Sequence, residues 1–244
     1  MSSSFLKHIP CEACGSSNGA AIYDDDHTHC FVCGVTAGGS SEGITSHSKT
    51  KRTAMEIKGE IKSIPDRGIT RSTCTKYEVR QDENSHYYPY TDGTGATVAA
   101  KVRGVADKSF TIRGDFKSAQ LFGQSLFSAG GKAVTICEGE LDALAAFQMQ
   151  GSLYPTVSVR NGAQAALKDC KAAFEWLDSF DSVVICFDAD EPGMKAAKEV
   201  AELFGGKSKV VKHLAGFKDA CDYLTAGKEK EFVNTWWRAE EFKP

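Results

Sequence analysis

The 244-residue sequence has no uninterrupted apolar run of the roughly 18 residues that a membrane-spanning helix needs. Its first residues, MSSSFLKHIP, lack the apolar core of a secretory signal peptide. The G-x-x-x-x-G-K-[ST] motif is also missing, which excludes a P-loop motor from this chain. Nine cysteines without an export signal indicate reduced thiols or metal ligation in place of disulfides. With 41% hydrophobic and 25% charged residues, the chain is expected to be a globular protein of two or three units with no membrane partner.

The sequence also lacks a positive net charge, since its formal charge is −3. Taken alone, this value argues against a protein that binds nucleic acid. The charges are unevenly distributed, however: Lys and Arg outnumber Asp and Glu over residues 44–80 and 96–120, whereas carboxylates are in excess over residues 131–244. This distribution favours phosphate binding by the first half and metal binding by the second, although a solvated basic surface would look the same.

Four of the nine cysteines have the spacing of a zinc site. Cys11 and Cys14 form one C-x₂-C pair, and Cys30 and Cys33 form a second pair after fifteen intervening residues. Four thiolates complete a tetrahedral shell, so we expect a structural Zn²⁺ and not a catalytic one. Short strands over residues 21–23 and 29–32 would make this segment a zinc ribbon. A redox or disulfide role for the same cysteines is the less favoured alternative.

His27 and His29 lie beside the second cysteine pair, together with Tyr23, Phe31 and a run of aspartates. Such side chains could contact the bases of a single strand. Exposed His and Tyr on a ribbon often have no such role, and that alternative stays open. The remaining cysteines show no pairwise spacing, and we interpret them as small core residues.

A strand–turn–helix unit carries the first group of carboxylates. The apolar run over residues 133–137 predicts a buried parallel strand, and the apolar spacing that follows predicts a helix. Glu138, Glu140 and Asp142 fall on the turn between them. Ligands of parallel α/β sheets lie at the carboxyl ends of the strands, so Glu138 is expected in a site.

A second unit repeats this arrangement about fifty residues later. The apolar run over residues 182–187 predicts another strand, and Asp188 and Asp190 follow it with side chains that project to the same side. Pro192 suits the first turn of the helix that comes next. Two acidic strand ends predict a site for Mg²⁺, or Mn²⁺ in its place. Helix capping by these carboxylates is the alternative.

Between the cysteines and the acidic turns, residues 37–60 have the composition of a flexible linker. We expect a short helix over residues 71–77 with Thr70 as its N-cap, and strands over 86–90, 96–103 and 109–113, with a turn at Asp92–Gly93. The alternation along the middle strand places Lys101 and Arg103 on one face. Nearby cations are Lys108, Arg113 and Lys117. This face could bind nucleotide and template phosphates, or could be ordinary solvated surface.

The two acidic turns, EGELDAL and DAD-E-P-G, resemble the two signatures of the TOPRIM fold over roughly residues 131–225. In that fold Asp219, within KDACD, matches a further metal ligand. Over nearly the whole chain the order of segments and details such as HIPCEACGSSNG, AAKVR and DKSF resemble the primase half of podovirus-type phage primase–helicases.

The resemblance implies a DNA-directed RNA polymerase that makes short primers on single-stranded DNA from ribonucleoside triphosphates. It implies Mg²⁺ on Glu138, Asp188, Asp190 and Asp219 with support from Asp142, and Glu138 as a possible base. Lys101 and Lys108 would be catalytic cations, Arg103 and Lys117 would bind nucleotide, and His27 would read the template. The common D-G-H of that family is absent around His27, so the base preference does not carry over. Partners would be a replicative helicase and a DNA polymerase, in the cytoplasm of the infected host cell.

The predicted architecture is a zinc ribbon (1–36), a linker (37–60), a basic α+β subdomain (61–130) and an α/β TOPRIM subdomain with a parallel sheet, flanking helices and a C-terminal helix (131–244). One alternative is a DNA-binding recombination mediator without enzymatic activity, which would place a helix-hairpin-helix before the zinc site. Another is a TOPRIM nuclease, which does not ordinarily need a ribbon. A topoisomerase is disfavoured because the chain has no room for a separate cleavage domain.

Overall fold

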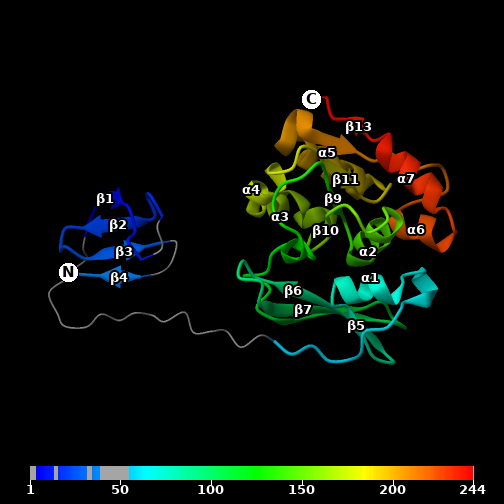
Figure 1. Ribbon diagram of the computed structural model, residues 1–244, viewed down its shortest axis with the longest axis horizontal. Coiled ribbons are helices and arrows are strands. Elements are labelled where there is room, and N and C mark those ends of the chain that lie inside the picture. The colour runs from blue at the N-terminus through cyan, green and yellow to red at the C-terminus, as the bar shows by residue number, and fades with distance from the viewer. Residues whose placement is uncertain (1–3, 14–15, 32–34, 39–54, 244) are drawn as a thin grey trace. The chain divides into compact units, whose positions relative to one another are not determined.

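The computed structural model describes residues 4–13, 16–31, 35–38 and 55–243, and the chain divides into two compact units, Met1–Thr53 and Ala54–Pro244 (Figure 1). None of the helices in the described part of the chain combines the length and apolarity that crossing a membrane requires. Most of the predicted linker, residues 39–54, lies outside the described residues. Its last residues are part of the second unit: the N–H of Met55 donates to the Thr97 carbonyl at 2.9 Å, and that of Glu60 to the Gln81 carbonyl at 2.9 Å.

The first unit is a four-stranded antiparallel sheet whose strands follow chain order: β1 (Phe5–Ile9), β2 (Ala20–Tyr23), β3 (Thr28–Cys30) and β4 (Thr36–Ala37). The two predicted strands correspond to β2 and β3, whereas β1 and β4 were not predicted. Its small core consists of Cys11, Ala20 and Cys30, with Ile9 packed against them. Cys14 and Cys33 lie outside the described residues.

The second unit begins with a 3₁₀ turn, η1 (Pro65–Arg67), and a short helix, α1 (Arg71–Lys76). Thr70 caps α1 as predicted, because its side-chain oxygen accepts a hydrogen bond from the Thr73 N–H at 3.3 Å. An antiparallel sheet of four consecutive strands follows: β5 (Arg80–Gln81), β6 (Ser85–Thr91), β7 (Thr97–Gly104) and β8 (Phe110–Gly114). The turn that starts at Asp92 joins β6 to β7, so the predicted hairpin is confirmed.

A five-stranded sheet forms the centre of the second unit, in the order β10-β9-β11-β12-β13. Its parallel strands are β9 (Val134–Cys137), β10 (Thr156–Ser158), β11 (Val183–Cys186) and β12 (Ser208–Val210), and the edge strand β13 (Glu240–Glu241) is antiparallel. The two predicted parallel strands are β9 and β11. They pair directly, with Cys137 opposite Cys186.

Helices cover both faces of this sheet (Figure 1). Those on one face are α2 (Glu140–Met149), α6 (Ala220–Thr225) and α7 (Glu229–Trp237); those on the other are α3 (Ala166–Ala172), α4 (Phe174–Asp178) and α5 (Glu191–Phe204). Successive residues of β11 alternate between the two cores: Val183 and Ile185 face α3 to α5, and Val184 and Cys186 face α2, α6 and α7. Burial on both sides explains why the strands are continuous apolar runs.

The antiparallel sheet and the parallel sheet share one core. Tyr88 and Tyr90 of β6 are fully buried in the same cluster as Leu144 and Phe147 of α2. The hydroxyl of buried Tyr77 donates to the carbonyl of Thr156 at the start of β10, at 2.8 Å. The two sheets are therefore held together by packed side chains, and the face of the antiparallel sheet that carries Lys101 is fixed beside the first turn of α2.

Candidate active site

The carboxylates predicted from the sequence meet at the carboxyl ends of β9 and β11. Because these strands pair in register, Glu138 and Asp188 come from one edge of the sheet. A cavity of about 540 Å³ opens there. Its lining includes four carboxylates and one lysine, together with residues of β8 and the loop after β10: Glu138, Glu140, Asp142, Asp188, Lys101, Phe110, Ile112, Gly139, Asn161 and Gly162.

Glu138 is the half-buried carboxylate at the centre of this edge. Its Oε2 atom is buried and has no hydrogen-bond partner within the described part of the chain. Burial, followed by the charge of Asp188, raises the pKa of Glu138, while hydrogen bonds from the backbone N–H groups of Ala163 and Asp188 lower it. A buried oxygen left unpaired among other carboxylates fits a cation.

Gly193, in the first turn of α5, permits this arrangement. A Cβ atom at that position would lie 2.3 Å from the carbonyl oxygen of Asp188 and 3.1 Å from Oε2 of Glu138. The first distance is shorter than any normal contact, so only glycine lets the helix start so close to the strand end. The backbone here is shaped around the Glu138 carboxylate.

Asp188 and Asp190 share one ammonium group. The Nζ atom of Lys218 lies 3.0 Å from Oδ2 of Asp188 and 3.1 Å from Oδ2 of Asp190. Hydrogen bonds to these carboxylates, that to Asp188 first, raise the pKa of Lys218. No role for Lys218 was predicted from the sequence, although its position next to Asp219 was a usable signal.

Asp190 also caps α5, because its Oδ1 accepts a hydrogen bond from the Gly193 N–H at 2.9 Å. This bond, and then Lys218, lowers the pKa of Asp190. The alternative of helix capping is therefore present in the structure. Capping uses Oδ1 of Asp190, and Oδ2 remains able to bind a cation.

A second acidic group comprises Asp142, Asp219 and Cys221, whose ligand atoms all lie within 4.8 Å of one another. Oδ1 of Asp142 accepts from the Cys221 N–H at 3.1 Å, and Asp219 caps α6 by accepting from the Asp222 N–H at 2.9 Å. Burial raises the pKa of both carboxyls, and for Asp142 the charge of Asp219 raises it further. Burial also raises the pKa of the Cys221 thiol, so the carboxylates are the better cation ligands.

Lys101 reaches this cavity from β7 and is paired there. Its Nζ lies 2.8 Å from Oε1 of Glu140 and 3.1 Å from the carbonyl oxygen of Arg160. The buried Tyr90 hydroxyl donates to the same Glu140 oxygen. Glu140 is only 4% exposed, so its charge needs these partners. The sequence identified Glu140 as a turn carboxylate but not as the counter-ion of Lys101.

The loop that carries Asn161 and Gly162 is held by a second buried pair. Asp169 of α3 accepts from the Arg160 guanidinium at 2.6 and 3.0 Å and from its backbone N–H at 2.8 Å. The same guanidinium donates to the carbonyls of Phe116 and Ala119. Nothing in the sequence pattern distinguished this pair, whose partners meet only through the fold.

The other predicted cations lie away from the cavity lining. Arg103 is buried on the same sheet face as Lys101, in register with His86, whose pKa is lowered by burial and by Arg103. Lys108 is exposed in the loop between β7 and β8 with φ of 55°, and Lys117 is exposed after β8. Within the described residues, the structure brings Lys101 but none of these three to the cavity.

In the first unit, His27 is held in place by two neighbours. Its ring stacks on that of Tyr23, with centroids 4.3 Å apart and planes 4° from parallel. Its Nδ1 contacts the carboxylate of Asp25, and the hydrogen bond with His27 lowers the pKa of Asp25. The His27 ring is thus oriented before any ligand binds.

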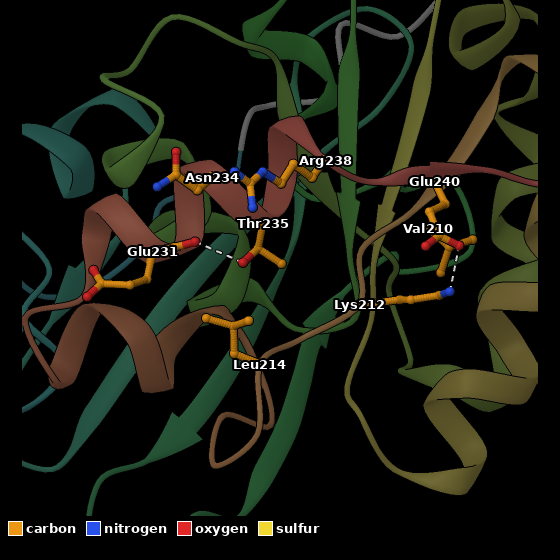
Figure 2. Close-up of a pocket in the computed structure, with 8 residues that line it drawn as sticks. All are labelled: Val210, Lys212, Leu214, Glu231, Asn234, Thr235, Arg238 and Glu240. Carbon is orange, nitrogen blue, oxygen red and sulfur yellow. Dashed lines mark hydrogen bonds and ion pairs between the residues drawn. The ribbon is translucent and has the colours of Figure 1, made fainter.

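A second hollow, of about 330 Å³, lies between α7, β12 and β13 (Figure 2). Lys212 and Glu240 pair with each other across it at 2.5 Å, and the Thr235 hydroxyl donates to the Glu231 carbonyl at 2.8 Å. Among the described residues that line it, none has a buried side-chain oxygen or nitrogen without a hydrogen-bond partner, in contrast to Glu138 at the first cavity. The carboxyl ends of β9 and β11 are therefore the candidate active site.

Comparison with known proteins identifies the fold and the family. A family model described as Toprim-like matches residues 135–224. The crystal structure of the primase fragment of the bacteriophage T7 primase–helicase is 34% identical, covers 96% of this chain and all of that fragment, and superposes with a TM-score of 0.68. This chain belongs to the phage primase family. The chain is also 36% identical to the DNA helicase/primase of Enterobacteria phage T3, over 98% of this chain.

The chain spans 45% of the length of that T3 relative. A bacteriophage T7 structure, in which lagging-strand DNA polymerase interacts with primase domains bound to an RNA/DNA hybrid, contains a chain 36% identical over 75% of this one, with a TM-score of 0.67. The Aquifex aeolicus primase, at 15% identity and a TM-score of 0.56, shares the fold. The predicted TOPRIM fold and the resemblance to phage primases are thereby confirmed.

Proposed function

We propose that this phage primase synthesises short RNA primers on single-stranded DNA by transferring nucleotidyl groups from ribonucleoside triphosphates to a 3′-hydroxyl. The observation that carries the proposal is the convergence of carboxylates on the unpartnered Oε2 of Glu138, at the strand ends of a chain in this family. The structure of a T7 relative with an RNA/DNA hybrid supports the same reaction class.

Mg²⁺, or Mn²⁺, would be held by Glu138, Asp188 and Asp190, with Asp142 and Asp219 completing a second position. These oxygen donors fit a hard divalent cation, and the orphaned Glu138 oxygen and the like-charge crowding at Asp142 support its presence. When bound, the metal would lower the pKa of the attacking hydroxyl and neutralise charge on the departing pyrophosphate.

Glu138 accepts the proton of the 3′-hydroxyl in this proposal. Burial makes its carboxylate a stronger base than a solvated one, which suits it to proton transfer near neutral pH.

Lys218 neutralises Asp188 and Asp190 while the site is without a divalent cation. With a divalent cation held by those carboxylates, the ammonium group of Lys218 would be free to contact phosphate oxygens.

Lys101 would contact the triphosphate from the cavity wall, with Arg103, Lys108 and Lys117 extending the basic surface toward nucleotide and template. In the first unit, Cys11, Cys14, Cys30 and Cys33 would hold a structural Zn²⁺; the burial of Cys11 and Cys30 in one small core supports this. His27, oriented by Tyr23 and Asp25, would contact template bases. A replicative helicase and a DNA polymerase would be the partners, in the cytoplasm of the infected host cell.

The test is primer synthesis by the full chain on single-stranded templates of varied trinucleotides, with labelled ribonucleotides and Mg²⁺ or Mn²⁺. Wild-type protein should give short RNA products, and Glu138→Gln should give none. Glu202→Gln is the matched control: it makes the same carboxylate-to-carboxamide change at an exposed residue of α5 and should retain activity. DNA binding without product would favour a recombination mediator, and cleaved template would favour a nuclease.

A further inference from the structure

Strand β8 presents two large apolar side chains to solvent at the active site. Phe110 is 54% exposed and Ile112 is 48% exposed. Arg103 pairs with Phe110 and Lys101 pairs with Ile112 across the antiparallel ladder, so these four side chains share one face of the sheet. Both apolar residues line the cavity that contains Glu138 and Asp188.

This combination restricts what the cavity can hold. A purely apolar ligand would leave the buried Oε2 of Glu138 without a partner, and a simple anion would leave the apolar wall in water. A nucleotide satisfies both halves, because it joins a polyanionic tail to a flat apolar base. The phosphates match Lys101 and the cation-binding carboxylates, and the base matches the wall formed by β8.

We propose that Phe110 and Ile112 form a platform on which the base of the ribonucleotide lies while its phosphates extend toward Lys101 and the strand-end carboxylates. This inference rests on the proposed function, since it identifies the base subsite of the same site. Contact with the face of a base is tolerant of sequence, because every base has a π face. The platform therefore holds any of the four ribonucleotides, and base selection is left to the template.

A polar residue of the cavity lining supports this arrangement. Asn161 is exposed on the loop fixed by the Arg160–Asp169 pair, so its amide is available to the polar edge of a bound base. The Phe110 ring also lies under the Lys101 ammonium, with 5.0 Å between Nζ and the ring centroid. A second explanation of Phe110 is therefore that it only positions Lys101 through this cation–π contact.

Calorimetric titration of the full chain with ATP and, separately, with inorganic tripolyphosphate, each with MgCl₂, separates these explanations. Phe110→Ala should weaken ATP binding by roughly tenfold, because the base loses the aromatic ring on which it stacks. Its affinity for tripolyphosphate should stay within about twofold of wild type. Phe110→Trp should retain ATP affinity. Ile112→Ala should weaken ATP binding several-fold without affecting tripolyphosphate.

Leu153→Ala removes an apolar side chain of 78% exposure that does not line the cavity, and should change neither titration. Unchanged ATP affinity in Phe110→Ala would overturn the platform. An equal loss for ATP and tripolyphosphate would also overturn it and assign Phe110 to positioning Lys101. If the wild-type chain makes no primers but Phe110→Ala binds ATP more weakly and tripolyphosphate unchanged, the proposed function fails while the base subsite stands.

Discussion

Replacing Asp190 by asparagine separates its two roles, because the two oxygens of the carboxylate have different partners. Oδ1 caps α5 at 2.9 Å from the Gly193 N–H, and Oδ2 lies 3.1 Å from the Lys218 ammonium. Asparagine caps a helix about as well as aspartate but carries no charge. Asp190→Asn should therefore remove the cation ligand and leave the helix start intact.

The expected magnitudes differ enough to be distinguished. Asp190→Ala loses the cap and should lower the free energy of unfolding by about 1 kcal/mol, or roughly 2–4 °C in Tm for a unit of this size. Asp190→Asn should keep Tm close to wild type. Loss of a ligand to a catalytic cation should cost several kcal/mol of transition-state stabilisation, so both variants should lose at least roughly 100-fold in primer synthesis.

Melting curves and primer yield, measured on the same preparations, are the assay. Thr70→Ala is the matched control: it removes the side-chain cap of α1, away from the cavity, and should lower Tm by a similar amount while retaining activity. Full primer synthesis by Asp190→Asn would refute the assignment and leave Asp190 as a helix cap alone.

Three further predictions concern the ion pair, the buried carboxyls and the division into units. Lys101→Met leaves the buried Glu140 without its counter-charge and should lower the free energy of unfolding by about 3 kcal/mol in urea titrations, with Glu140→Gln added to it restoring most of the loss. The folded-state pKa values of Glu138 and Asp142 are raised, so these carboxyls contribute stability to the cation-free fold at pH below their unfolded pKa values, near 4. This contribution is lost as pH rises through the folded-state pKa values, where both groups become charged. Mg²⁺ should therefore raise Tm more at about pH 8 than at about pH 5. The fragment 54–244 should fold without zinc and join ribonucleotides weakly, but lose template preference.

Each of these has a contrary result. Equal stability of Lys101→Met and wild type would mean that Glu140 does not depend on its ammonium partner. If Mg²⁺ raises Tm by the same amount at both pH values, the cation does not bind at Glu138 and Asp142. A fragment 54–244 that keeps full preference on a template panel would move template reading out of the first unit, and His27→Ala should then be silent as well.

The strand–turn–helix units could be predicted from the sequence because their determinants are local. A continuous apolar run sets a strand buried on both faces, and Asp190 followed by Pro192 starts a helix wherever the unit is placed. Thr70 as the cap of α1 and the turn at Asp92 were predictable for the same reason. Because β9 and β11 are neighbours and parallel, local prediction also located Glu138 and Asp188 at one edge.

The tertiary structure alone decided which partner each of these side chains has. The sequence placed Lys101 and Arg103 on one face, but strand register and packing bury Arg103 and join Lys101 to Glu140, far away in the chain. Alternation along β8 did not reveal that Phe110 would stay exposed, since exposure depends on what covers a sheet face. Lys218 meets Asp188 and Asp190 only because the chain returns to the ends of these strands after β12. Periodicity and capping act within one element, whereas buried charge pairs and cavity walls are made between elements, and the order of the strands determines them.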